Sequence, residues 1–132
     1  MLEGQRKGNT NKIKGGHSPK INNANPDFAT EVIKINPDGT KVIKFIKQFP
    51  DGKISKIKTS TLFPNGWSDA KIIDSIQKVA NGKVIGVRAS DGAELLRGTV
   101  DGVEIEVIKI GNEVVSGYST GGGASGLLTG FE

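Results

Sequence analysis

The chain contains a single histidine, and the residues around it suggest chemistry. His17 follows Gly15 and Gly16 and precedes Ser18. Two consecutive glycines can adopt positive φ angles and turn backbone N–H groups toward an anion. An imidazole, with an ordinary pKa of about 6.5, can accept or donate a proton at neutral pH. The segment therefore favours proton transfer on a phosphodiester, and the alternative is a surface histidine in a loop.

The distribution of charge favours a polyanionic partner. The formal net charge is +4, but residues 1–66 carry 12 Lys/Arg against 5 Asp/Glu, whereas residues 67–132 carry 6 against 9. The first half is therefore strongly basic and the second half is acidic. A basic half of this kind is typical of proteins that bind nucleic acid. Charge alone leaves open the alternative that the lysines only solvate exposed strand faces.

Composition excludes several classes of protein. At 132 residues the chain is long enough for one domain with a core of its own. The absence of cysteine excludes disulfides and thiolate chemistry, and one histidine without cysteine argues against a structural zinc site. We expect no metal and no cofactor. No apolar run is long enough to span a membrane and no signal peptide is visible over residues 1–10, which fits a cytosolic protein or a piece of a larger one.

Turn residues and β-branched residues predict an antiparallel sheet. Asp-Gly and Gly-Asn dipeptides separate segments rich in Ile, Val, Phe and Thr. Along the stretch Val103 to Val107, apolar residues alternate with glutamates, which predicts that Glu104 and Glu106 face solvent. The expected strands cover residues 28–35, 41–49, 54–63, 83–89, 93–100, 103–108 and 113–119.

One helix is clearly indicated after residue 67. Ser68 is a good N-cap, Asp69 suits the positive end of the helix dipole, and Gly82 can end the helix. The apolar residues between them recur at helical spacing. Trp67 and Ile72 have the spacing of a hydrophobic staple, so we interpret Trp67 as a core residue rather than a base-stacking one. The predicted fold is a small α+β domain in which the helix packs on the antiparallel sheet.

Three stretches together resemble the bacterial EndoU family of ribonuclease toxins. The most specific stretch is Lys58-Thr-Ser-Thr-Leu-Phe-Pro64 followed by Trp67-Ser-Asp69 at the helix start. The stretch from Gly102 to Thr120, which opens with a Gly-Val-Glu-Ile strand and closes with Tyr118-Ser-Thr120, is similar to the end of the family, and Gly15-Gly16-His17 resembles its catalytic-histidine motif. The resemblance implies a concave antiparallel sheet related to barnase-like and RelE-like toxins. We expect a flexible lead-in over residues 1–14, the nuclease domain over 15–120 and a Gly-rich tail over 121–132.

The resemblance also implies an activity and its biological setting. Members are metal-independent endoribonucleases that cleave RNA, frequently tRNA, and no DNA substrate is expected. Many are the C-terminal toxins of large proteins used in bacterial competition, such as contact-dependent growth inhibition, and travel with a cognate immunity protein. We therefore expect secretion or cell-surface delivery as part of a larger protein, with action in the cytoplasm of the target cell.

The sequence departs from the family pattern at one catalytic group. Members normally use two histidines and a lysine, and the first histidine lies in a His-Ile-Leu-x-Gly segment. Residues 1–16 contain no histidine. Either that segment lies upstream of residue 1, or another group replaces its histidine. The two-histidine mechanism therefore cannot be transferred intact.

The chemistry of metal-free RNA cleavage assigns roles to the residues that match. The 2′-OH must lose a proton and attack phosphorus, the 5′-oxygen must gain one, and a cation must stabilise the equatorial oxygens. His17 is the candidate base or acid, Lys58 the candidate cation, and Tyr118 positions the substrate or donates the other proton. Without the resemblance, Lys58 and Tyr118 would be a surface lysine and a sheet aromatic. The candidate substrate-binding residues are Lys14, Gly16, Lys56, Ser60, Thr61, Ser119 and Thr120, of which Lys14 and Lys56 are substitutes for Lys58.

A second class of function stays open. The chain fits a non-catalytic module that binds RNA or another anion, or a degenerate toxin that lost its chemistry with the first histidine. A structural β-domain from a large exported protein is a third class, but it does not explain the basic first half.

Overall fold

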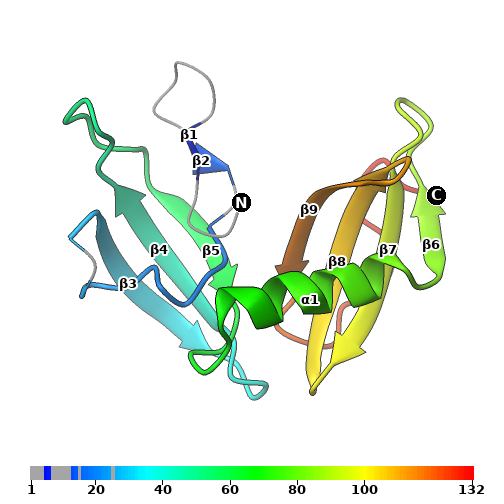
Figure 1. Cartoon of the computed structure of the whole chain (residues 1–132), viewed down its shortest axis with the longest axis horizontal. Coiled ribbons are helices and arrows are strands. Elements are labelled where there is room, and N and C mark those ends of the chain that lie inside the picture. Colours follow the sequence, from blue (N-terminus) through cyan, green and yellow to red (C-terminus); the bar gives the residue numbers. More distant parts are fainter. Residues whose placement is uncertain (1–4, 7–12, 15, 25) are drawn as a thin grey trace.

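The computed structural model describes residues 5–6, 13–14, 16–24 and 26–132. Two larger antiparallel sheets, a two-stranded ribbon and a helix make up the regular structure of the described part of the chain (Figure 1). The first sheet has the order β3-β4-β5, with β3 (Phe28–Ile35), β4 (Lys41–Lys47) and β5 (Lys58–Leu62). The second sheet has the order β6-β7-β8-β9, with β6 (Val84–Val87), β7 (Glu94–Val100), β8 (Val103–Ile110) and β9 (Glu113–Ser119). The predicted α+β class is confirmed, with the strands divided between two sheets.

Two short strands precede the first sheet. β1 (Gln5–Arg6) pairs antiparallel with β2 (Ile13–Lys14). The predicted flexibility of the rest of the lead-in over residues 1–14 lies outside the described residues. The strand expected from residue 54 begins only at Lys58. The ladder is interrupted there because the backbone N–H of Lys47 donates to Ser55 Oγ while the N–H of Ser55 donates to the Lys47 carbonyl, both at 2.8 Å.

Helix α1 (Asp69–Ala80) begins and ends as its flanking residues predict. Ser68 caps it, because its Oγ accepts a hydrogen bond from the Lys71 backbone N–H at 3.1 Å. The helix ends at Ala80, and Asn81 is its C-cap residue, one position before the predicted glycine. Trp67 is 9% exposed and stacks on Phe63 with ring centroids 5.7 Å apart, which confirms its interpretation as a core residue.

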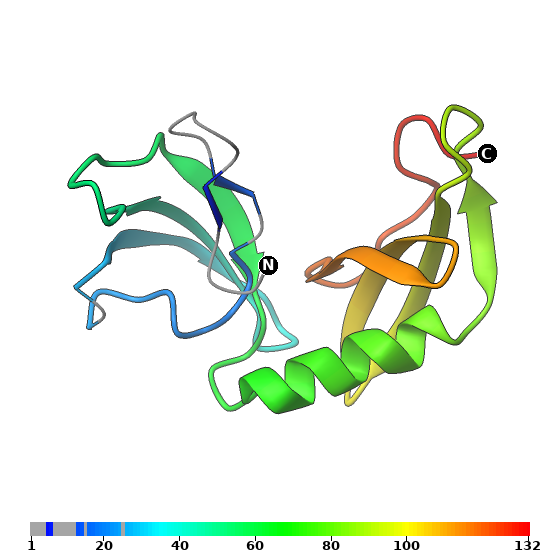
Figure 2. The same cartoon turned by 45° about the horizontal axis from the view of Figure 1, so that its top comes forward.

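The helix covers one face of the second sheet. Ile72, Ile76 and Val79 are buried in one cluster with Leu96 and other residues of β7 and β8. Burial of apolar side chains of this size is the main stabilising term for such a contact. A Cβ atom at Gly117 would lie 2.8 Å from Ile76 Cδ1, so only glycine lets β9 approach the helix this closely. Figure 2 shows the helix along the second sheet, with its N-terminal end toward the first sheet.

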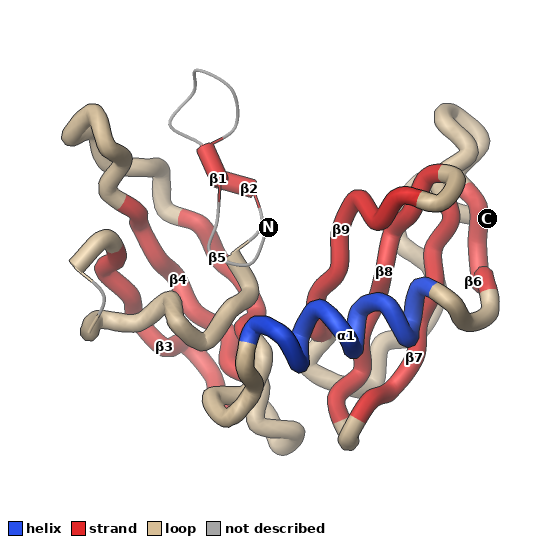
Figure 3. Tube along the Cα trace, viewed as in Figure 1, coloured by secondary structure: helices blue, strands red, loops and turns tan. Residues whose placement is uncertain are grey.

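The opposite face of the second sheet is covered by the C-terminal segment, residues 120–132 (Figure 3). Ala124 donates its backbone N–H to Glu104 Oε1 at 2.9 Å, and Phe131 is buried against Leu95. The prediction that Glu106 faces solvent is wrong, since this residue is only 4% exposed. The alternation along β8 identifies two faces, but the segment that covers the second face lies distant in sequence.

Candidate active site

The loop that carries His17 runs beside β5, an edge strand of the first sheet. The carbonyl of His17 accepts a hydrogen bond from the Phe63 N–H at 2.9 Å, and Ser60 Oγ donates to the Gly16 carbonyl at 2.6 Å. Gly16 has a φ of +94°, and a Cβ atom there would lie 2.6 Å from Phe45 Cζ. Both its backbone conformation and its contact with Phe45 therefore require glycine.

The hydrogen bonds of the imidazole fix its tautomer. His17 Nδ1 lies 2.8 Å from the Thr61 carbonyl oxygen, which can only accept, so Nδ1 carries the proton. Ser60 Oγ lies 3.1 Å from the same nitrogen and already donates to Gly16, so it is a second acceptor. In the neutral ring Nε2 then holds the lone pair. The geometry makes Nε2 the basic atom of His17.

The surroundings of His17 favour its neutral form. Burial lowers the pKa of the imidazole below its ordinary 6.5, the hydrogen bond to Thr61 opposes this, and the positive charge of Lys58 lowers the pKa further. At neutral pH the ring is therefore uncharged and ready to accept a proton. This is the state that a general base needs before the reaction.

Lys58 lies at the start of β5, on the same face of the strand as Ser60. Its side chain is half-buried, and burial lowers the pKa of the ammonium group from its ordinary 10.5. The charge of Lys58 acts on the imidazole of His17, so the structure brings these two predicted residues together. A half-buried ammonium group beside an imidazole is suited to stabilise phosphate oxygens.

Tyr118 reaches this site from the second sheet. Its ring centroid lies 6.0 Å from that of His17, with the planes inclined by 35°. The hydroxyl donates to Glu106 Oε1 at 3.1 Å. Burial, and then the charge of Glu106 and this hydrogen bond, raise the pKa of Tyr118 far above its ordinary value of 10.0. Of the two roles expected for Tyr118, positioning the substrate therefore fits better than donating a proton.

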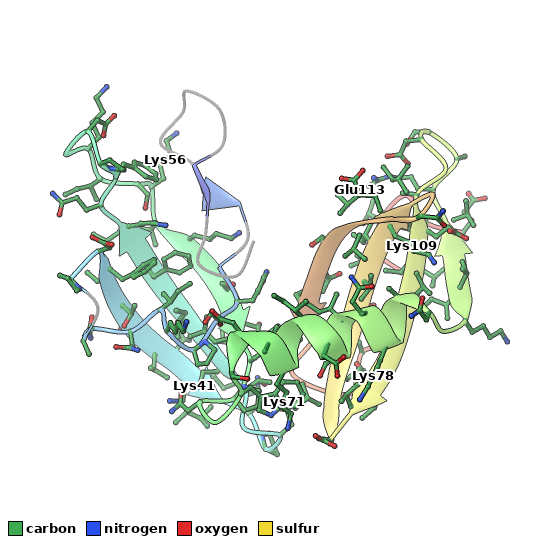
Figure 4. The ribbon with its side chains drawn as sticks, viewed as in Figure 1. Lys41, Lys56, Lys71, Lys78, Lys109 and Glu113 are labelled. Atoms are coloured by element: carbon green, nitrogen blue, oxygen red, sulfur yellow. The ribbon has the colours of Figure 1, made fainter. Side chains whose placement is uncertain are left out.

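Four of the candidate substrate-binding residues remain to be placed: Ser119, Thr120, Lys56 and Lys14. Ser119 is 2% exposed and lies on the face of β9 opposite to Tyr118, while Thr120 Oγ1 donates to Glu104 Oε1 at 2.7 Å. Their hydroxyls are thus enclosed or engaged within the fold. Lys56 is exposed and lies at the opposite end of the first sheet from Lys41 (Figure 4). Lys14 belongs to β2, and its side chain lies outside the described residues.

Sequence reasoning missed Arg97 and Glu106, which lie behind Tyr118. Arg97 donates to Glu106 Oε2 through Nε at 3.0 Å and through Nη2 at 2.5 Å. The only local signal was the break in apolar content at Glu106, and this signal also fits a solvent-facing residue. The C-terminal segment that buries Glu106 has no sequence pattern that links it to β8.

The described residues form neither a cluster suited to a metal ion nor a helix suited to span a membrane. Within residues 16–24 and 26–132, together with the short strands β1 and β2, no three His, Asp or Glu side chains are grouped so as to hold a metal ion. In the same part of the chain, no helix is long and apolar enough to cross a membrane.

A basic imidazole beside a half-buried lysine, joined by an aromatic side chain from a second sheet, defines a site suited to a nuclease. The chain matches the family Bacterial EndoU nuclease over residues 1–121. It therefore belongs to this family, and the resemblance predicted from its motifs is confirmed. Comparison with curated proteins and with solved structures gives no match.

Proposed function

We propose that this protein is a metal-independent endoribonuclease in which His17 is the general base. The observation that carries this proposal is the hydrogen bond from His17 Nδ1 to the Thr61 carbonyl, which leaves Nε2 with the lone pair. The lowered pKa of His17 keeps the ring neutral at pH 7, because burial disfavours the imidazolium ion. Membership of the EndoU nuclease family supports a phosphodiester as substrate.

The reaction we propose is an in-line transesterification of RNA. Nε2 of His17 takes the proton of the 2′-OH, the 2′-oxygen bonds to phosphorus, and the bond from phosphorus to the 5′-oxygen breaks. The products are a 2′,3′-cyclic phosphate and a free 5′-OH. The ammonium group of Lys58 stabilises the charge on the equatorial oxygens. Among the described residues, Lys58 is also best suited to protonate the 5′-oxygen, since burial lowers its pKa and makes it a stronger acid.

Tyr118 has the position of a substrate-orienting residue in this proposal. The centroid of the Tyr118 ring lies 6.0 Å from that of the His17 ring, so a nucleotide that packs on Tyr118 would hold the ribose close to the His17 imidazole. Its raised pKa argues against a role as acid, because burial and Glu106 both disfavour loss of the hydroxyl proton. Orientation of this kind can contribute several orders of magnitude to a rate.

The finer expectations of substrate, partner and setting are also proposals. Lysines on the first sheet, including Lys41, Lys44 and Lys47, support binding of an extended polyanion such as tRNA. The excess of Lys and Arg over Asp and Glu in residues 1–66 also supports inhibition by an immunity protein that is acidic at its contact. Family membership supports delivery from a larger secreted or cell-surface protein during bacterial competition, with action in the target-cell cytoplasm. The boundaries expected at residues 14 and 120 belong with these proposals.

A non-catalytic RNA-binding module is the second candidate function, and one observation favours it. The chain has one histidine where the two-histidine mechanism of the family needs two. This alternative predicts RNA binding that depends on salt, but no cleavage of RNA at any pH.

Incubation of the purified protein with total RNA in EDTA separates the two functions. The proposal predicts fragments that end in 2′,3′-cyclic phosphates, because a nucleophile within the ribose is used. Intact RNA, under conditions in which the protein binds it, would support the binding module. Fragments with 3′-OH ends would contradict the transesterification itself.

A further inference from the structure

Three polar side chains form a row across the second sheet. Arg97 pairs with Glu106 in the register of β7 and β8, and Glu106 pairs with Tyr118 in that of β8 and β9. Residues paired directly across antiparallel strands point to the same face. The Glu106 carboxylate uses one oxygen for the Tyr118 hydroxyl and the other for Arg97. The row therefore ends at the tyrosine ring that lies beside His17.

This row is enclosed by the protein. The side chains of Arg97 and Glu106 are 18% and 5% exposed. Arg97 Nη2 also donates to the carbonyl oxygen of Gly126 at 2.7 Å, so the C-terminal segment holds the guanidinium from outside. A buried carboxylate is costly unless it is paired and fully hydrogen-bonded, and here both conditions are met. Such an arrangement is stiffer than an exposed ion pair.

The row determines how the Tyr118 ring can move. The ring is half-buried, and its hydroxyl finds its acceptor on Glu106. Rotation of the ring away from His17 would leave the hydroxyl or the carboxylate unsatisfied in a partly dry site, which costs free energy. Arg97 in turn prevents Glu106 from changing rotamer, because its guanidinium holds the other carboxylate oxygen.

We propose that Arg97 and Glu106 are positioning residues that hold Tyr118 in the orientation needed for RNA cleavage. This inference rests on the proposed function, and it adds two residues of the second sheet to a site whose cation lies on the first sheet and whose base lies in the loop beside that sheet. Neither residue touches the reacting atoms. Their effect is transmitted through the hydroxyl of Tyr118.

The first test measures how Glu106 affects the titration of Tyr118, and it needs no activity assay. Tyr118 is the only tyrosine, so the tyrosinate absorbance of the whole protein reports this residue alone. Glu106→Gln removes the negative charge and keeps the volume, and it should lower the pKa of Tyr118. Glu113→Gln is the control, because Glu113 is an exposed carboxylate at the start of β9, the strand that carries Tyr118. This control should leave the tyrosine titration unchanged.

The second test reads the positioning role through kinetics. Glu106→Gln should reduce kcat for RNA cleavage about tenfold and leave KM within about twofold, because orientation of the substrate is lost while lysine contacts with phosphate persist. Glu113→Gln should retain the wild-type kcat. A Glu106→Gln variant that keeps the wild-type kcat would overturn the positioning role even if its tyrosine titration shifts.

A double variant guards against misfolding. Glu106→Gln alone leaves Arg97 enclosed without a countercharge, which destabilises proteins more than loss of the whole pair. Arg97→Gln with Glu106→Gln removes both charges, and we expect the same direction of change in kcat and in the pKa of Tyr118. A folded double variant with wild-type kcat overturns the inference. If the wild-type protein itself fails to cleave RNA, the proposed function and this inference fall together, whereas an active wild type with insensitive variants overturns this inference alone.

Discussion

His17 Nδ1 lies 2.8 Å from the carbonyl oxygen of Thr61 on β5. Because the acceptor is a backbone atom, the position of the imidazole follows from the path of the strand rather than from a second titratable side chain. The same loop is held by the Phe63 N–H and by Ser60 Oγ. The orientation of the ring is therefore built into the first sheet before any RNA binds, which is what a preorganised base requires.

The pKa of His17 should be below 6.5, and it can be measured directly because the chain has one histidine. Burial of the ring causes this shift by disfavouring the charged form. The acid limb of kcat/KM for RNA cleavage should follow the same pKa. An NMR titration of the imidazole protons, compared with the pH-rate profile, checks both. A pKa of His17 above 6.5 would contradict the burial argument.

The lowered pKa of His17 also has a consequence for stability. The unfolded chain binds a proton at His17 more readily than the folded chain, so the contribution of this residue to stability is fully present above pH 6.5 and is lost as pH falls through the folded pKa. Urea unfolding at a series of pH values measures this dependence. His17→Asn should remove this part of the slope, and an unchanged slope in that variant would assign the dependence to other groups.

Removal of the Lys58 side chain should change both the rate of RNA cleavage and the pKa of His17. Lys58→Ala removes a positive charge that lowers the pKa of His17, so the imidazole should titrate at a higher pH than in the wild type. Cleavage should slow, and the defect in RNA binding should shrink at high salt because a phosphate contact is lost. Lys83→Ala is the control, since it removes an exposed lysine outside the site. Equal effects of the two variants would reduce Lys58 to a general contributor of charge.

Gly16→Ala should lower the free energy of unfolding more than the same substitution at Gly52, a turn residue. At Gly16 the new Cβ atom would lie 2.6 Å from Phe45 Cζ on a backbone with φ of +94°, whereas Gly52 has a φ of +82° and no neighbour within 4 Å. Strain alone costs about 1–2 kcal/mol, and overpacking adds about 1–3 kcal/mol. Denaturant unfolding of both variants measures the difference. A Gly52→Ala variant as unstable as Gly16→Ala would show that the Phe45 contact yields easily.

An inhibitor that covers the His17 face should depend on charge. The first half of the chain is basic, with 12 Lys/Arg against 5 Asp/Glu, so a protein that blocks this face should present carboxylates there. Its association should slow as ionic strength rises, because exposed charges are screened beyond about 8 Å at physiological salt. Measurement of association rates over a salt series tests this. Rates independent of salt would contradict an acidic contact.

Much of the local structure could be predicted from sequence because it depends on neighbouring residues. The ends of β3 and β9 follow their turn signals, and Ser68 caps the helix as its side chain allows. Trp67 lies in the core for the same reason, since the staple depends on residues only a few positions away. In each case the interaction that decides the structure lies within one turn or hairpin.

The assembly of the site could not be predicted in the same way. The division of the strands between two sheets, and the approach of Tyr118 to His17, depend on packing between segments far apart in sequence. The family resemblance indicated which residues belong to the site, but not that the Tyr118 hydroxyl is held by Glu106. That contact follows from the pairing of Glu106 with Tyr118 in the register of β8 and β9, and the burial of Glu106 beneath the C-terminal segment has no signal in the periodicity of β8.

The central claim is that Nε2 of His17 is the base for RNA cleavage, and one substitution tests it most directly. His17→Asn keeps a side-chain N–H that can reach the Thr61 carbonyl, so the loop should remain on β5, but it has no group that can take the 2′-OH proton. We predict that this variant unfolds cooperatively like the wild type and binds RNA with similar affinity. Its single-turnover cleavage rate in EDTA should fall about 10²–10⁴-fold. Cleavage by the folded variant at the wild-type rate would contradict the account.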